Sequence, residues 1–186
     1  MGVGALRAVF LDRDGVLNRT IICNGKPYPP ATLEELEILP GVPQALADLK
    51  KCGLLLLVVT NQPDVARGTQ QRAMVESLHA ALAKNLPIDE FFVCYHDDGD
   101  GCDCRKPKPG LLLQAAARYG LDLPNSFLIG DRWRDIEAGY AVGCSTVWID
   151  DGYAERGPSS PPAARVGSCP EGARWIIQQV RKWSER

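Results

Sequence analysis

Short runs of apolar, β-prone residues alternate along the chain with segments whose apolar positions recur at helical spacing. The runs predict strands over residues 8–11, 54–59, 91–95, 126–129 and 145–149. The helical spacing predicts helices over 42–51, 70–85, 111–119 and 133–142, and a last helix over 171–183 that follows a linker-like loop at 158–170. Strands that alternate with helices predict an α/β fold, a Rossmann-like three-layer sandwich around a mostly parallel central sheet.

Two segments interrupt this regular pattern. Residues 19–40 are rich in proline and polar side chains, and residues 95–109 are rich in Asp, Gly, Cys and Lys. In open α/β sheets the loops at the carboxyl ends of the strands build the functional site, so both segments are predicted to form its walls. Neither is long enough for a large cap domain, and we expect one domain over residues 1–186.

The overall composition excludes several classes of partner. The chain is 45% hydrophobic and 24% charged, with a formal net charge of -2 and a pI near 5.7, so it carries no global basic field for nucleic acid. Its apolar runs are strand-sized, well short of the roughly 18 residues of a membrane span, and its start lacks the layout of a signal peptide. We expect a cytoplasmic monomer without nucleic-acid or membrane partners.

Charged and polar residues cluster where the predicted strands end. Asp12, Asp14 and Gly15 follow the first strand directly. Alone they would suit a polar turn or a helix N-cap. The other predicted strand ends add further polar groups at the same edge of the sheet, namely Thr60, Asn61, Arg105, Lys106, Asp131 and Asp135.

These residue types favour phosphoryl-transfer chemistry. Clustered carboxylates repel one another and stay ionised together most easily around a divalent cation such as magnesium. One carboxylate can attack phosphorus to give an aspartyl phosphate, and a second can act as general acid and then general base. A hydroxyl and an ammonium group, here Thr60 and Lys106, suit the oxygens of the transferring phosphoryl group.

A second cluster has the spacing of a metal site. Cys94, His96, Cys102 and Cys104 form the pattern C-x-H-x5-C-x-C, and the residues between them are polar and rich in glycine. Three thiolates and one imidazole suffice for a closed tetrahedral zinc site without an open position. We therefore expect a structural zinc loop, inserted at 94–104, that fixes Arg105 and Lys106.

The motifs together resemble one known family. DRDG at 12–15, Thr60, Lys106 and GDRWRD at 130–135 match the four motifs of the haloacid-dehalogenase-like phosphatases, over roughly residues 9–150. Within that family, FLDRDGVLN, TNQPDVARG and CDCRKPKPG look like the zinc-containing heptose 1,7-bisphosphate 7-phosphatases. The segment after the first motif and the short spacer in the cysteine loop depart from that subgroup.

The resemblance implies roles for individual residues. It makes Asp12 the nucleophile and Asp14 the acid/base, with magnesium held by the Asp12 side chain, the Asp14 backbone carbonyl and Asp131, and with Asp135 nearby. Thr60 and Lys106 would bind the transferring phosphoryl group. Substrate contacts are expected from Asn18, Asn61, Gln62, Arg67, Arg105 and Arg132, although Arg67 also suits a loop cap. His79 is expected to be a surface or partly buried histidine without a metal partner.

The resemblance implies a magnesium-dependent phosphomonoesterase that removes the C7 phosphate of a heptose bisphosphate, in heptose biosynthesis for lipopolysaccharide or a similar polysaccharide. A histidinol-phosphate phosphatase or another small sugar-phosphate phosphatase is the alternative within the same class. A DNA 3′-phosphatase is disfavoured by the acidic pI. A zinc-pinned binding module without catalysis would be expected to lack Asp12, Asp14, Lys106 or Asp131, and this chain has all four.

Overall fold

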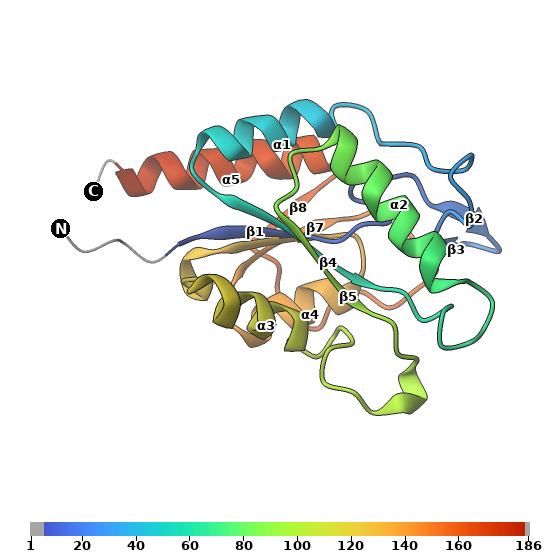
Figure 1. Ribbon diagram of the computed structural model, residues 1–186. Coiled ribbons are helices and arrows are strands. Elements are labelled where there is room, and N and C mark those ends of the chain that lie inside the picture. Colours follow the sequence, from blue (N-terminus) through green and yellow to red (C-terminus); the bar gives the residue numbers. More distant parts are fainter. Residues whose placement is uncertain (1–5, 185–186) are drawn as a thin grey trace.

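A six-stranded parallel sheet forms the centre of the molecule. The computed structural model describes residues 6–184. The sheet has the order β5-β4-β1-β6-β7-β8. The parallel sheet between layers of helices (Figure 1) confirms the α/β three-layer fold predicted from the sequence. Its strands are β1 (Ala8–Leu11), β4 (Leu55–Asn61), β5 (Glu90–Cys94), β6 (Phe127–Gly130), β7 (Ser145–Ile149) and β8 (Ala164–Val166).

Helices cover both faces of this sheet. They are α1 (Val42–Lys51), α2 (Arg72–Asn85), α3 (Gly110–Tyr119), α4 (Trp133–Ala141) and α5 (Cys169–Ser184). Figure 1 shows α1 and α5 side by side on one face, with α3 and α4 on the other. β1 is buried on both sides because Val9 and Leu11 face the first layer, whereas Ala8 and Phe10 face the second.

The strand register brings the carboxyl ends of three strands together. Leu11, the last residue of β1, lies opposite Val58 of β4 and Ile129 of β6. The Asp12 amide then donates a hydrogen bond to the Ile129 carbonyl at 3.0 Å, which extends the pairing by one residue. β1 lies between β4 and β6, where the order of the strands along the chain reverses direction. In open α/β sheets, ligands bind at this point, outside the carboxyl ends of the strands.

Two short elements were not predicted from the sequence. β2 (Ile21–Cys23) and β3 (Lys26–Tyr28) form an antiparallel hairpin inside the segment expected to be irregular. Its turn, Asn24-Gly25, has positive φ at both residues, which is the two-residue turn that Asn-Gly favours. The other is β8, which lies in the predicted loop at 158–170 and joins the edge of the sheet beside β7.

Both elements lack the signal by which the other strands are recognised. Each of the strands β2, β3 and β8 has only three residues, and these residues are partly or fully exposed, so no continuous apolar run marks the strand. The remaining differences are shifts of one or a few residues at the ends of elements, such as β5, which begins at Glu90 and ends at Cys94. Among the helices of residues 6–184, none is long and apolar enough to cross a membrane.

Two neighbouring leucines of α3 test how the helix is held on the sheet. Leu112 is fully buried, whereas Leu113 is 50% exposed. We expect Leu112→Ala to lower the free energy of unfolding by about 2–5 kcal/mol, because it leaves a cavity in a packed layer. The matched substitution Leu113→Ala should cost less than about 1 kcal/mol. Urea unfolding measures both, and equal losses would contradict the packing described here.

Candidate active site

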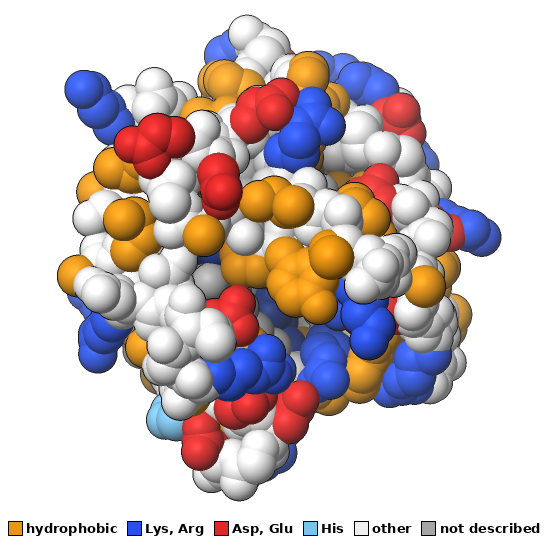
Figure 2. All heavy atoms as spheres, turned by 90° about the vertical axis from the view of Figure 1, so that its right-hand side faces the viewer, with side chains coloured by type: hydrophobic (Ala, Val, Ile, Leu, Met, Phe, Trp, Pro, Cys, Tyr) orange, Lys and Arg blue, Asp and Glu red, His pale blue; other side chains and the backbone are white. Residues whose placement is uncertain are grey.

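A polar cavity opens at the carboxyl edge of the sheet. It has a volume of about 280 Å³. Figure 2 looks onto this edge, where Lys, Arg, Asp and Glu side chains surround a hollow beneath a group of hydrophobic side chains. Ten predicted site residues line the cavity: Asp12, Asp14, Thr60, Asn61, Arg67, Arg105, Lys106, Asp131, Arg132 and Asp135.

Lys106 lies at the centre of this group. Its Nζ is 2.9 Å from Asp12 Oδ1, donates to the Val59 carbonyl at 2.7 Å and is paired with Asp135 Oδ1. Burial by itself lowers the pKa of this ammonium group, but the charges of Asp12 and Asp135 outweigh it and leave the pKa above its ordinary value. The lysine therefore stays charged and joins β1, β4 and α4.

Neighbouring side chains hold the loop that carries this lysine. The Asn61 amide donates to the Lys106 carbonyl at 3.0 Å, and its Oδ1 accepts from the Lys106 amide at 3.1 Å. Because Asn61 ends β4, this pair of hydrogen bonds fixes the loop to a strand end. Thr60, one residue earlier, is buried and points its hydroxyl into the cavity, where it accepts from Gln62 Nε2 at 2.9 Å.

Three carboxylates form a group that could hold a cation. Ligand oxygens of Asp12, Asp131 and Asp135 all lie within 4.8 Å of one another, and all three residues are buried. Burial raises the pKa of Asp12 to about 6 against the opposing effect of Lys106, and nearby carboxylates add to the rise. Burial and the charges of Asp12 and Asp135 also raise the pKa of Asp131 well above its ordinary value.

The fit to a divalent cation rests on Asp131. Both of its carboxylate oxygens are buried without a hydrogen-bond partner in the described part of the chain. Buried polar atoms normally have partners, and an ion that takes oxygen ligands would supply one. Magnesium suits this set of oxygen donors, because it needs only one or two carboxylates and keeps several waters.

Two glycines make room for these carboxylates. A Cβ on Gly130 would lie 2.2 Å from Cβ of Asp135, and a Cβ on Gly15 would lie 2.1 Å from Asp131 Oδ2. Gly15 also has φ +84°, in the left-handed region. Close approach therefore requires a glycine at both positions, and at Gly15 the backbone conformation requires it as well.

Asp14 is held from the side opposite the cavity. Its carboxylate accepts from Asn18 Nδ2 and from Gln62 Nε2, both at 2.9 Å. Burial raises the pKa of Asp14, but the Arg13 guanidinium and these hydrogen bonds outweigh burial and leave it below the ordinary value. Asn18 and Gln62 were predicted to contact substrate, yet neither lines the cavity. Asn18 contacts the lining residue Asp14, and Gln62 contacts Asp14 and Thr60.

Each predicted arginine of the rim is paired with an acid. Arg67 binds Asp97 at 2.6 Å, Arg105 binds Asp98 at 2.8 Å, and Arg132 is paired with Glu155. Burial and the Glu155 partner act in opposite directions on Arg132, and its pKa lies above the ordinary value. These pairs orient the guanidinium groups around the mouth while part of their charge is already compensated.

The sequence analysis missed several residues at this edge. Lys26 and Tyr28 of the β2–β3 hairpin line the cavity, as do Arg134 and Glu155. The Asn-Gly turn was the available signal for the hairpin. His79 was expected to be a surface or partly buried histidine, but it is buried, 6% exposed, beside Arg13. It is buried because it lies on the same side of α2 as Val75, Leu78 and Leu82, which are buried as well.

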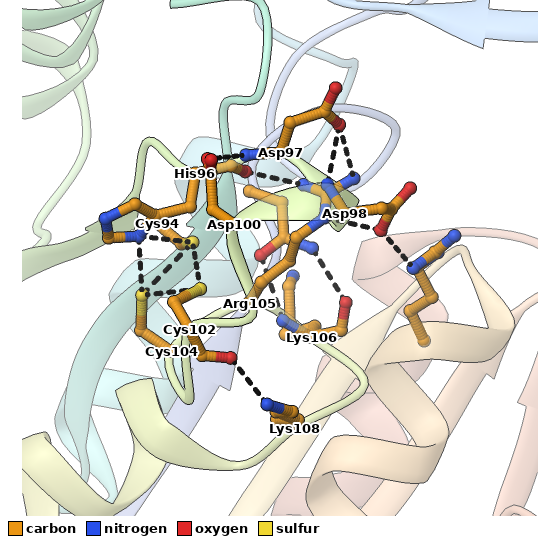
Figure 3. A network of polar contacts seen from close by, with 12 residues as sticks. Cys94, His96, Asp97, Asp98, Asp100, Cys102, Cys104, Arg105, Lys106 and Lys108 are labelled. Atoms are coloured by element: carbon orange, nitrogen blue, oxygen red, sulfur yellow. Dashed lines mark hydrogen bonds and ion pairs between the residues drawn. The ribbon is translucent and has the colours of Figure 1, made fainter. Parts of the chain in front are cut away.

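The cysteine loop has the geometry of a four-ligand metal site (Figure 3). Cys104 Sγ lies 3.2 Å from Cys94 Sγ, 3.5 Å from Cys102 Sγ and 3.3 Å from His96 Nδ1. Ligands about 2.3 Å from a central zinc would form a tetrahedron with edges of about 3.8 Å, close to these separations. Arg105 and Lys106 follow Cys104 directly, so the cluster lies at the base of the cavity wall.

A matched pair of glycine substitutions tests the contact between Gly15 and Asp131. Gly15 and Gly53 both have positive φ, but a Cβ on Gly53 has no heavy atom within 4 Å. We expect Gly15→Ala to weaken magnesium binding by about tenfold or more, because Asp131 must move, and Gly53→Ala to leave it unchanged. Titration calorimetry with magnesium measures both. Equal affinities would show that Asp131 does not depend on this contact.

Solved structures with the same fold include phosphatases. A D,D-heptose 1,7-bisphosphate phosphatase from B. bronchiseptica, complexed with magnesium and phosphate, superposes with a TM-score of 0.76 at 29% identity and covers 94% of this chain and 99% of its own. A HAD-like phosphatase described as putative from Mesorhizobium loti also gives 0.76, at 26% identity, over 95% of this chain and 88% of its own.

Sequence relatives agree with the structural ones. The family model described as HAD-hydrolase-like matches residues 103–167. A D-glycero-beta-D-manno-heptose-1,7-bisphosphate 7-phosphatase from Pseudomonas putida is 38% identical over 81% of this chain and 86% of its own. The enzyme of that name from Escherichia coli is 36% identical over 93% and 89%. This chain therefore belongs to the haloacid-dehalogenase-like phosphatases and is a phosphoric monoester hydrolase.

Proposed function

We propose that the chain removes the C7 phosphate of D-glycero-D-manno-heptose 1,7-bisphosphate. The observation that carries this proposal is the buried group of Asp12, Lys106, Asp131 and Asp135 at the floor of an open polar cavity. The names of relatives that are 36–38% identical over most of their length support the choice of substrate. The product would feed the assembly of an activated heptose.

Asp12 is the proposed nucleophile. One of its carboxylate oxygens is held by Lys106, which orients the group and keeps it ionised against burial. The other oxygen would attack phosphorus and give an aspartyl phosphate, which water then hydrolyses. Lys106 and the Thr60 hydroxyl would bind the equatorial oxygens of the phosphoryl group while charge spreads over them.

Asp14 is the proposed general acid and base. It lies two residues after Asp12 and lines the same cavity, so it can reach the leaving oxygen on the side away from the nucleophile. In the first step it would give a proton to the sugar alcohol, and in the second it would take one from the attacking water. Asn18 and Gln62 would serve this reaction by holding Asp14 in place.

The proposed magnesium ligands are the Asp12 and Asp131 side chains and the Asp14 backbone carbonyl. Asp135 is engaged by Lys106 and by the Arg132 amide, which donates to Oδ2 at 3.0 Å. We therefore assign Asp135 to holding Lys106. When bound, magnesium would neutralise charge on the phosphoryl oxygens.

Arginines of the rim are the proposed contacts to the rest of the substrate. Arg67, Arg105 and Arg132 point their guanidinium groups at the mouth, where a second phosphate or sugar hydroxyls could replace part of their present acid partners. Asn61 lines the cavity between them. Because no cap domain within residues 6–184 closes over the cavity, these loops would supply the selectivity.

We propose that the cysteine loop binds a structural zinc ion. The near-tetrahedral separations of its four ligand atoms support this assignment, and the full set of protein ligands leaves no position for substrate. Reduced thiolates are required, which favours the cytoplasm. We also propose that the protein is a monomer and that residues 1–186 form one domain.

A substrate panel tests the proposed function. With magnesium present, we expect phosphate release from both anomers of heptose 1,7-bisphosphate to exceed release from histidinol phosphate and from a DNA 3′-phosphate. Asp12→Asn should lower kcat by about 10³-fold or more, because it removes the nucleophile. Asp48→Asn, on the solvent-facing side of α1, is the control. Higher activity on histidinol phosphate would show that this compound, and not the heptose bisphosphate, is the substrate. A rate for Asp12→Asn equal to that of the parent protein would refute the mechanism.

Removal of one thiolate tests the zinc site. We expect Cys104→Ser to bind less than one equivalent of zinc and to unfold at a lower temperature, because a closed metal site contributes directly to folding. It should also raise KM, because Arg105 and Lys106 lose their support. Metal analysis, thermal unfolding and kinetics measure these effects beside Cys52→Ser, whose thiol lies outside the cluster. Full stability of Cys104→Ser without zinc would contradict the assignment.

A further inference from the structure

Arg13 is a charged side chain buried inside the protein between the two aspartates of the first motif. It is fully buried, with no exposed surface, and it does not line the cavity. The alternation of an extended backbone sends Asp12 and Asp14 to the cavity and Arg13 to the opposite side. A buried guanidinium needs partners for its five N–H groups, so its contacts show what it holds.

Those contacts converge on Asp14. Arg13 Nε lies 3.1 Å from each Asp14 carboxylate oxygen, and Nη2 lies 2.9 Å from Oδ2. Nη2 also donates to Gln62 Oε1 at 3.1 Å, while Gln62 Nε2 donates to Asp14 at 2.9 Å. Arg13 and Gln62 thus close a ring of hydrogen bonds with Asp14, and the carboxylate has little freedom to rotate.

His79 fixes the other end of the guanidinium. Its Nε2 lies 3.1 Å from Arg13 Nη1, and its ring stacks on Phe91 with centroids 4.6 Å apart. Because Arg13 has only donors, Nε2 must be the acceptor and the imidazole neutral. Burial and the Arg13 charge lower the pKa of His79 to about 4, in agreement with this state.

We propose that Arg13 is a positioning residue for the general acid and that His79 orients Arg13. This inference rests on the proposed role of Asp14. Asp14 is 16% exposed at the floor of an open cavity, and no cap domain presses it towards a leaving group. Asp14 is instead supported on the side away from the cavity. His79 of α2 contacts Arg13, and Arg13 in turn contacts Asp14. Rigid support of this kind is what catalytic geometry requires.

The dependence of rate on the leaving group separates this role from a purely structural one. A sugar alcohol is a poor leaving group and needs the proton from Asp14, whereas p-nitrophenolate leaves without it. Asp14 is also the proposed base of the second step, which both substrates share, so the comparison uses single-turnover release of the leaving group. We expect Arg13→Met to lower this rate for the sugar phosphate by about 10- to 100-fold and for p-nitrophenyl phosphate by less than about threefold. Arg118→Met, which removes an exposed ion pair on α3, is the control.

A second pair of variants covers the case in which Arg13→Met does not fold. His79→Gln keeps an acceptor near the position of Nε2, whereas His79→Leu removes it. We expect His79→Leu to lower single-turnover release from the sugar phosphate by about 3- to 10-fold, again with little effect on the aryl phosphate, and His79→Gln to restore most of the rate. Neither change touches a group in the cavity, so KM should stay near the parent value.

The two levels of proposal fail in different ways. Equal losses on both substrates for Arg13→Met and His79→Leu, in step with lower thermal stability, would overturn the positioning role. Asp14→Asn is measured beside them. If Asp14→Asn slows single-turnover release of the leaving group equally from both substrates, Asp14 is not the acid and the mechanism under "Proposed function" is wrong. If Asp14→Asn slows only the sugar phosphate and the Arg13 and His79 variants do not, only the inference made here is wrong.

Discussion

The ammonium group of Lys106, buried among carboxylates, is the interaction on which the site depends. It contacts Asp12 after β1, the Val59 carbonyl on β4 and Asp135 on α4, so one charge joins three elements. Without it, Asp12, Asp131 and Asp135 would concentrate negative charge in a buried space. Removing one member of a buried ion pair typically costs about 3–5 kcal/mol, because the partner stays charged and unpaired. The same contact that stabilises the sheet edge also holds Asp12, the proposed nucleophile.

The loop that delivers this lysine is anchored at both ends. On one side, Asn61 makes two hydrogen bonds with the Lys106 backbone. On the other side, the side chains of Cys94, His96, Cys102 and Cys104 lie close together and hold the loop in a compact conformation (Figure 3). Arg105, between these anchors, turns outward to Asp98. A loop fixed in this way can present one residue to the floor of the cavity and the next to its rim, which suits a phosphatase without a cap domain.

The first motif serves two sides of one strand end. Asp12 and Asp14 face the cavity, and Arg13 faces a buried network that reaches α2. Gly15 allows Asp131 to approach closely. In the proposed mechanism the motif therefore meets three demands: a nucleophile, a supported acid and space for a cation ligand. Each demand fixes a residue type, and the extended backbone fixes which side each residue faces.

The sequence by itself determined the layers, the parallel sheet, ten of the residues that line the cavity and the two clusters of ligand atoms. Buried strands and amphipathic helices have strong periodic signals, and the carboxyl ends of parallel strands must meet. Only the tertiary structure decided the β2–β3 hairpin, β8, the burial of His79 and the acid partners of the rim arginines. These features depend on pairing between segments far apart in the chain, for which short exposed strands and single polar side chains carry no periodic signal.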